Sequence, residues 1–186
     1  MAQMTIEPTS FDGIWSVSPF FIEDRRGSFC KFYDEKLFAE KGLENHFTES
    51  YYSVSHRNVI RGMHFQIPPF DHAKLVYVSK GSITDVILDL RAGSPTFRQY
   101  FQTELNVQNH TALYMAKGFA HGFLSHEDET IVTYLQTSPH ELSADKGVLF
   151  NSFGYDWKVE KPIVSDRDLS FPTLEAFQTP FIYSET

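Results

Sequence analysis

The sequence contains very little cysteine: Cys30 is the only one among 186 residues. A single cysteine cannot form a disulfide within the chain, which excludes a disulfide-stabilised scaffold and is typical of proteins of the reducing cytoplasm. Basic residues are also scarce, since 16 lysines and arginines stand against 24 aspartates and glutamates and leave a net charge of -8. We therefore predict a cytoplasmic protein that does not bind nucleic acid, because nucleic-acid surfaces are basic.

No apolar run is long enough to span a membrane, and residues 1–10 lack the basic start and apolar centre of a signal peptide. Repeats, low-complexity tracts and linker-like segments are absent too, so we predict one domain over residues 1–186 and no membrane association. The chain does contain 41% hydrophobic residues, with 18 phenylalanines and 9 tyrosines overall. This composition is typical of a packed, aromatic-rich β domain.

Short segments of strand-forming residues, with turn residues between them, run through most of the chain. Strands are predicted over residues 14–22 (interrupted by Pro19), 28–33, 47–55, 58–66, 74–78, 82–90, 97–105, 112–115, 122–124 and 130–136. Asp34 is predicted to cap a short helix that Gly42 ends, and a second short helix is predicted over residues 172–177. Residues 118–121 are predicted to form a tight corner, and residues 138–157 to form loops. This pattern indicates an antiparallel sandwich or barrel, which can enclose one ligand.

One predicted strand, residues 58–66, combines apolar side chains with Arg61 and His64, which a plain core strand would avoid. Strict alternation puts Arg61 on the face of Met63 and Phe65, and His64 on the opposite face. If this strand lines a cavity, His64 points to the place where a ligand would bind. Taken alone, His64 also fits an ordinary half-buried histidine.

Three further side chains make a chemical role for His64 more specific. Lys74 begins an otherwise apolar strand, so it either reaches solvent at the strand end or points into the cavity. His121 lies in a glycine-flanked segment, and Tyr134 lies on the face of its strand opposite Ile131; either one alone also fits a purely structural role. A base, a cation and a phenol suit proton transfer beside a carbonyl, because they can remove an α-proton, stabilise the enolate oxygen and return a proton.

A metal site is the main competing use of His64 and His121. Metal-binding barrels of this kind combine clustered histidines with a nearby carboxylate. Here the residue two positions after His64 is Gln66, and the next strand begins with Lys74. Because a cation disfavours a metal ion beside it, we predict no metal.

Several spaced motifs carry a resemblance to a known family. They are RGMHFQ at 61–66, KLV at 74–76, DLRAGSPTF at 89–97 and GFAHGF at 118–123, with DRRGSF at 24–29 and PIVSDRD at 162–168. From about residue 13 to residue 174 the chain resembles the dTDP-4-dehydrorhamnose 3,5-epimerase family. The resemblance implies a cupin-type jelly-roll β-barrel or sandwich with a few short peripheral helices, a homodimer, and neither metal nor organic cofactor. It implies nucleotide-diphospho-4-keto-6-deoxy sugars as substrates.

The resemblance also implies roles for individual residues. By position, His64 is similar to the general base of the family, and Asp168 to the carboxylate that pairs with it and fixes its tautomer. Lys74 matches the lysine that stabilises the enolate, and Tyr134 the tyrosine that reprotonates the sugar from the opposite face. His121 matches a second cavity histidine near the keto oxygen. The implied reaction is inversion of C3, C5 or both through an enolate.

Substrate-binding residues are predicted in the same way. Arg26 and Arg61 match pyrophosphate-binding arginines, although from the residues alone they also fit ordinary surface charges. Glu49, Tyr51 and Gln66 are predicted to contact the substrate, and the family usually has a glutamine and an asparagine where this chain has Glu49 and Tyr51. Two alternatives stay open: a single-site C3- or C5-epimerase acting on a CDP- or GDP-linked sugar, and a non-catalytic nucleotide-sugar binder.

Overall fold

The structure, a computed structural model that describes residues 3–184, consists almost entirely of β-strands. In chain order its elements are β1 (Thr5–Pro8), β2 (Ile14–Ser18), β3 (Phe20–Asp24), β4 (Gly27–Lys31), α1 (Glu35–Glu40), β5 (Glu49–Ser55), β6 (Ile60–Gln66), β7 (Lys74–Lys80), β8 (Ser82–Asp89), β9 (Tyr100–Asn106), β10 (Ala112–Met115), β11 (Phe119–Ser125), β12 (Thr130–Gln136), β13 (Asp145–Gly147) and α2 (Asp166–Leu169).

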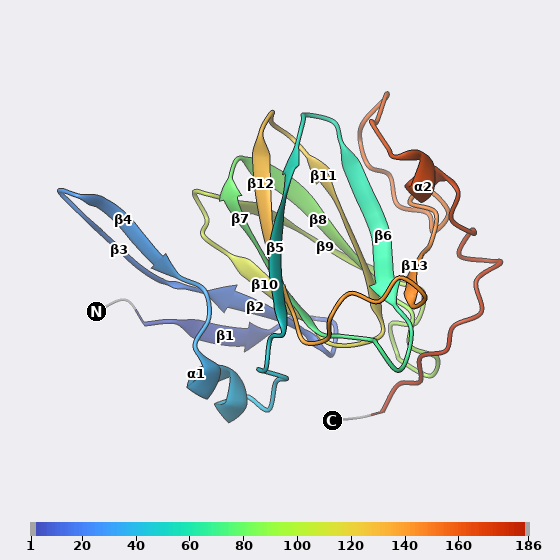
Figure 1. The fold of residues 1–186 in the computed structure, drawn as a ribbon, viewed down its shortest axis with the longest axis horizontal. Helices are drawn as coiled ribbons and strands as arrows, with labels where there is room; N and C mark the ends of the chain where they lie inside the picture. The colour runs from blue at the N-terminus through green and yellow to red at the C-terminus, as the bar shows by residue number, and fades with distance from the viewer. Residues whose placement is uncertain (1–2, 185–186) are drawn as a thin grey trace.

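Two antiparallel sheets face each other (Figure 1). The six-stranded sheet has the order β1-β2-β10-β7-β12-β5, and the five-stranded sheet has the order β13-β6-β11-β8-β9. The predicted fold class is confirmed: an all-β jelly-roll sandwich of the cupin type with short peripheral helices. Within residues 3–184, no helix is long and apolar enough to cross a membrane.

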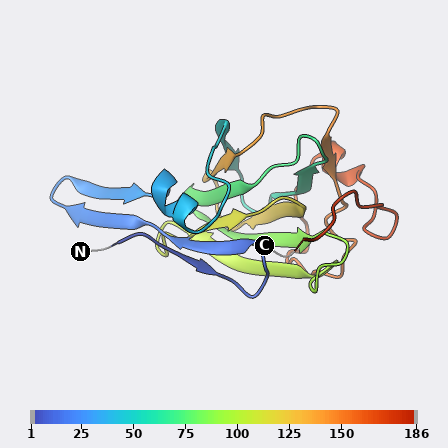
Figure 2. The same ribbon diagram turned by 90° about the horizontal axis from the view of Figure 1, so that it is seen from below.

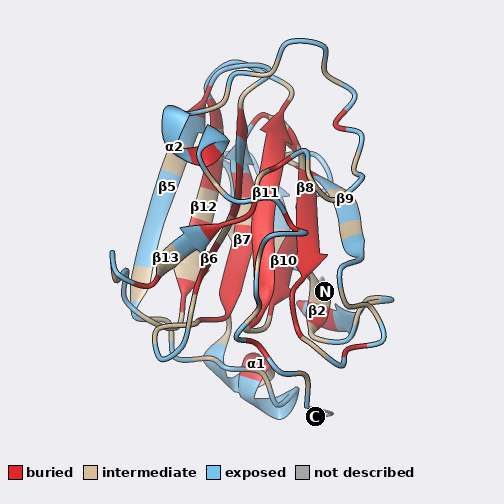
Figure 3. Ribbon diagram, turned by 90° about the vertical axis from the view of Figure 1, so that its right-hand side faces the viewer, coloured by how far each residue is buried: buried red, intermediate tan, exposed pale blue. Residues whose placement is uncertain are grey.

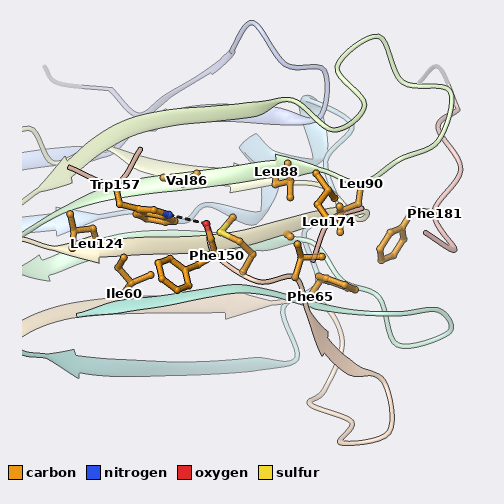
Figure 4. Close-up of a cluster of buried hydrophobic side chains, with 13 residues drawn as sticks. Ile60, Phe65, Val86, Leu88, Leu90, Leu124, Phe150, Trp157, Leu174 and Phe181 are labelled. Carbon is orange, nitrogen blue, oxygen red and sulfur yellow. Dashed lines mark hydrogen bonds between the residues drawn. The ribbon is translucent and has the colours of Figure 1, made fainter. Parts of the chain in front are cut away.

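Apolar side chains pack on both faces of each sheet. Between the sheets lie Ile14, Val76, Val78, Ile83, Ile87, Leu105, Leu113, Met115, Phe119, Phe123 and Val132. Figure 4 shows a second cluster, in which side chains of β6, β8 and β11 pack against the C-terminal segment and the Trp157 indole N–H donates to the Phe150 carbonyl at 2.9 Å. A third cluster, around Phe38 of α1, covers the opposite side of the six-stranded sheet. Because both sheets are covered, β11 is buried along its length (Figure 3).

The first predicted helix is confirmed, and the second is wrong. The carboxylate of Asp34 accepts a hydrogen bond from the Leu37 amide at 3.3 Å and so caps α1. The C-terminal helix is α2, at residues 166–169 rather than 172–177. Ser165 caps it by accepting a hydrogen bond from the Asp168 amide at 3.1 Å. This short helix therefore begins six residues before the predicted one.

Two strands differ from the prediction in ways that affect the cavity. The predicted corner at residues 118–121 is wrong, because the turn lies at Lys117 and Gly118, with φ of 86° at Gly118, and β11 then pairs with β8 along its whole length. His121 is therefore a strand residue. In the region predicted as loops, β13 pairs with β6 and brings Gly147 opposite His64.

The strands β3 and β4 form a separate two-stranded hairpin that projects from the body of the protein (Figure 2). Arg25 and Arg26 form its turn, and Ile22 and Phe29 on its strands are 43% and 56% exposed. The hairpin thus carries both basic and apolar side chains into solvent.

Candidate active site

The two sheets enclose a cavity of about 470 Å³ whose lining comes from both of them. His64 and His121 project from the five-stranded sheet, whereas Lys74 and Tyr134 project from the six-stranded sheet. The structure thus brings together the four residues that the sequence reasoning singled out first. The complete lining is Glu49, Tyr51, Ser53, Arg61, His64, Phe65, Gln66, His72, Lys74, His121, Phe123, Tyr134, Gln136, His140, Asp145 and Arg167.

His64 is held by Asp168, which α2 places beside β6. The His64 Nε2 atom lies 2.9 Å from Asp168 Oδ1, and Asp168 Oδ2 accepts the Gly62 N–H at 3.0 Å. Burial raises the pKa of Asp168, but the hydrogen bonds with His64 and Gly62 outweigh burial and hold this pKa below its usual value. An ionised carboxylate can only accept hydrogen bonds. The proton of a neutral His64 therefore sits on Nε2, which leaves Nδ1 as a proton acceptor.

Arg61 lies on the cavity side with His64, which corrects the alternation predicted from the sequence. The pairing of β6 with β11 shifts register, since His121 is opposite His64 but Phe123 is opposite Arg61. The additional residue on β6 forms a β-bulge, which moves Arg61 to the face of His64. Gly62, with φ of 131°, allows this bulge, because a Cβ there would lie 2.5 Å from the Gly122 Cα atom. The Arg61 guanidinium bonds the Ser55 hydroxyl and the Val54 carbonyl, both at 3.0 Å.

Lys74 is a buried cation in the cavity rather than a strand-end residue that reaches solvent. Only 8% of the residue is exposed. Burial lowers the pKa of Lys74 to about 8, although the charges of Asp145 and Asp85 oppose this shift. Burial, followed by the charge of Lys74, lowers the pKa of His72 to about 3. His72 is therefore neutral, and near neutral pH the ammonium group of Lys74 supplies the positive charge on this side.

Tyr134 is a protonated phenol at neutral pH. Its hydroxyl lies 3.2 Å from the Ser53 hydroxyl, and the edge of the His121 ring packs against it with centroids 6.1 Å apart. Burial raises the pKa of Tyr134 well above its ordinary value, and the Ser53 hydrogen bond offsets only part of this. The phenol can therefore donate a proton to a carbanion, but it is a poor base.

Sequence reasoning missed the partner of His121. His121 Nε2 lies 2.6 Å from Asp85 Oδ2, and both side chains are buried. Within residues 3–184, Asp85 Oδ1 has no hydrogen-bond partner, so His121 is the side chain that satisfies this carboxylate. A signal for Asp85 existed, because it is a lone carboxylate in the apolar run 83–88.

A cluster at the edge of the cavity was also missed. Asp145 on β13 forms an ion pair with Arg167, with Asp145 Oδ2 2.8 Å from Arg167 Nη2, and His140 Nε2 lies 3.1 Å from the same oxygen. The Arg167 guanidinium lies over the Phe171 ring, 5.3 Å from its centroid, and the edge of Phe171 packs on His64. These residues follow no strand pattern, so local patterns did not indicate them.

Among the other predicted substrate-binding residues, three line the cavity and Arg26 does not. Glu49 and Tyr51 line the cavity. Gln66 also lines it, but its amide bonds the Phe70 and Pro139 carbonyls and the Glu141 N–H, so it holds the neighbouring loops in place. Arg26 lies at the tip of the hairpin, paired with Asp24 and with 80% of its side chain exposed, and does not line the cavity of its own chain.

The donor set does not resemble a metal centre. His64 and His121 each direct Nε2 to a carboxylate, and the cation Lys74 lines the same cavity. Among residues 3–184, no group of three or more histidine, cysteine, aspartate or glutamate side chains is arranged to hold a metal ion. The predicted absence of a metal remains a prediction.

Known proteins similar to this chain share both its sequence and its fold. A family model described as dTDP-4-dehydrorhamnose 3,5-epimerase matches residues 8–176. The dTDP-4-dehydrorhamnose 3,5-epimerase of Methanothermobacter thermautotrophicus is 36% identical over 94% of this chain and 96% of its own. A dTDP-4-dehydrorhamnose 3-epimerase of Streptomyces niveus is 34% identical over 89% of this chain and 81% of its own.

A solved structure of the dTDP-6-deoxy-D-glucose-3,5-epimerase of Legionella pneumophila, in complex with dTDP-4-keto-L-rhamnose, superposes with a TM-score of 0.93. It is 28% identical to this chain and covers 98% of it, with all of its own chain matched. Together with the fold, these matches define an isomerase, a sugar epimerase of the cupin class. The chain belongs to the dTDP-4-dehydrorhamnose 3,5-epimerase family.

Proposed function

We propose that this protein inverts C3, C5 or both in a nucleotide-diphospho-4-keto-6-deoxy sugar, without a cofactor, through an enolate. The observation that carries the proposal is the position of the base and the acid. His64 projects from one sheet and Tyr134 from the other, with the cavity between them. Inversion needs a proton to leave one face of a carbon and another to arrive on the opposite face, and this arrangement can provide both.

The reaction follows from the groups present. His64 Nδ1 takes the proton on the carbon next to the C4 carbonyl, and the electron pair of the C–H bond moves to make an enolate, with negative charge on the C4 oxygen. The Lys74 ammonium stabilises that charge in a water-poor site. Tyr134 then protonates the carbon from the other face, the C4 carbonyl re-forms, and solvent restores both protonation states. C3 and C5 are both adjacent to C4, so the same groups serve either carbon.

The relatives indicate the substrate. Those described above are named for dTDP-linked 4-dehydro sugars, and the Legionella protein was solved with dTDP-4-keto-L-rhamnose. We infer dTDP-4-keto-6-deoxyglucose as the substrate, in deoxysugar biosynthesis towards dTDP-L-rhamnose or a related sugar. Because the Streptomyces relative is a 3-epimerase and the others are 3,5-epimerases, the test must distinguish inversion of one carbon from inversion of two.

Proton NMR in deuterium oxide tests the proposal directly. With dTDP-4-keto-6-deoxyglucose, we expect deuterium to enter at C3, C5 or both, and the inverted sugar to accumulate. Deuterium at one carbon would define a single-site epimerase. Exchange only with the CDP- or GDP-linked analogue would show that Glu49 and Tyr51 mark a changed base pocket. No exchange with any of these sugars would contradict the proposal and favour a non-catalytic binder.

The kcat/KM is expected to fall above a pH of about 8, because Lys74 loses its proton there. Only the charged form of Lys74 stabilises the enolate. The kcat/KM is therefore at its maximum below this pH and drops about tenfold per pH unit above it. An anionic substrate stabilises the ammonium form, so the corresponding fall in kcat is expected at higher pH. In Lys74→Arg the guanidinium stays charged. The remaining kcat/KM of this variant should therefore no longer fall as the pH rises. A wild-type profile that is flat to about pH 10 would contradict this role.

We also propose a cytoplasmic, single-domain protein that forms a homodimer, in which the β3–β4 hairpin of one copy reaches the cavity of the other. This would reconcile the predicted pyrophosphate role of Arg26 with its distance from its own cavity, and it would cover the exposed Phe29.

Arg26→Ala should raise KM about tenfold with a smaller effect on kcat, whereas Arg25→Ala is the control. A single-chain mass in light scattering would contradict the dimer.

A further inference from the structure

Tyr51 lies directly against the proposed acid. The two residues are opposite each other in the pairing of β5 with β12. Their rings are stacked, with centroids 4.9 Å apart and planes 20° apart. Such an offset stack fixes the plane of both rings, because any rotation of one ring meets the face of the other.

Tyr51 is itself held at its hydroxyl end. The hydroxyl donates to Gln136 Oε1 at 3.2 Å, and Gln136 Nε2 donates to Glu49 Oε2 at 3.0 Å. The other Glu49 oxygen accepts the His140 N–H at 3.1 Å. This chain of hydrogen bonds ends on backbone, so the Tyr51 ring is a fixed support rather than a mobile surface side chain.

The remaining sides of Tyr134 are held as well. Ser53 bonds its hydroxyl at 3.2 Å, and the edge of His121 packs at 6.1 Å between centroids. Ser53 bonds the hydroxyl and His121 meets the ring at an angle of 72°, whereas Tyr51 stacks on a face of the ring. Removal of the Tyr51 ring would therefore remove this stacking contact without touching the hydroxyl of Tyr134.

We propose that Tyr51 is a positioning residue for Tyr134, and that it determines how often the enolate is protonated from the face opposite His64. This inference rests on the proposed function. Without the Tyr51 ring, the enolate persists longer and His64 returns a solvent-derived proton to the original face.

The test measures two quantities in deuterium oxide: deuterium incorporated, and inverted product formed per deuterium incorporated. Tyr51→Leu removes the ring and should leave incorporation within about threefold of wild type while lowering inversion per deuterium about tenfold. Tyr51→Phe keeps the stack and should restore the ratio to within about twofold. Tyr52→Leu, at the neighbouring position, which is 67% exposed, is the matched control and should leave both quantities unchanged.

Other results would overturn the role of Tyr51. If Tyr51→Leu raises KM but leaves inversion per deuterium unchanged, Tyr51 contacts the nucleotide instead. If incorporation and inversion fall in parallel, with a lower melting temperature, the residue is only structural. These outcomes differ from failure of the proposed function, in which the wild-type protein itself would incorporate no deuterium.

Discussion

His64→Asn is expected to abolish exchange of the substrate α-proton with solvent. The Nδ1 atom of His64 can accept that proton, because Nε2 is engaged with Asp168 at 2.9 Å. An asparagine amide can still donate to Asp168, so the fold is retained, but it cannot accept a proton at neutral pH. Loss of a general base lowers a rate about 10³-fold. Deuterium incorporation followed by NMR should therefore fall to near the uncatalysed rate.

A histidine far from the cavity provides the control for this variant. His56→Asn changes a side chain that is 81% exposed and contacts Asp128 on the surface, and it should exchange at the wild-type rate. The melting temperature of His64→Asn, measured by circular dichroism, should stay close to that of wild type. A fully active His64→Asn protein would show that His64 is not the general base.

Tyr134→Phe is expected to separate the two halves of the reaction. The variant keeps His64 and Lys74, so deprotonation and deuterium incorporation should continue within about fivefold of wild type, whereas inversion should fall about 10²-fold or more. The phenylalanine ring keeps the stack on Tyr51 and loses the hydrogen bond to Ser53. The product should therefore be deuterated substrate with its original configuration, which NMR distinguishes from the epimer.

Tyr52→Phe is the control, because it removes a hydroxyl from the adjacent, exposed tyrosine. If Tyr134→Phe forms the inverted sugar at the wild-type rate, another group supplies the second proton. If exchange and inversion vanish together, Tyr134 contributes to deprotonation as well. Either result would contradict the proposal that His64 removes the proton and Tyr134 returns one from the opposite face.

Much of the fold could be predicted from local patterns. The strands around Lys74 and Tyr134 are visible as short apolar segments between turn residues, and the cap at Asp34 is visible as a residue type at a helix start. The errors lie where pairing overrides pattern. β13 exists because it adds to the edge of β6, and β11 runs straight through residues 119–125 because β8 pairs with it throughout.

The site was predicted less evenly than the fold. The base and the cation stand out because histidine and lysine are unusual in apolar strands, whereas tyrosine is common in strands and Tyr134 was indicated only together with the other two. Arg61 was placed on the wrong face, because a bulge in β6 adds a residue that strict alternation cannot anticipate. Asp85 was overlooked although it interrupts an apolar strand, since nothing near it in the sequence indicates that its partner is His121.

Composition, strand pattern and spaced motifs were enough to indicate an acidic, all-β epimerase with His64, Lys74 and Tyr134 at its centre. Only the tertiary structure decided which groups meet. It showed Asp168 bonded to His64, 104 positions apart, a pair that the family resemblance implied but for which the residues alone provided no reason. It also set base and acid on opposite sheets and stacked Tyr51 on Tyr134. The reason is physical: local patterns report which face of a strand a side chain occupies, whereas contacts between strands and sheets depend on register, bulges and packing.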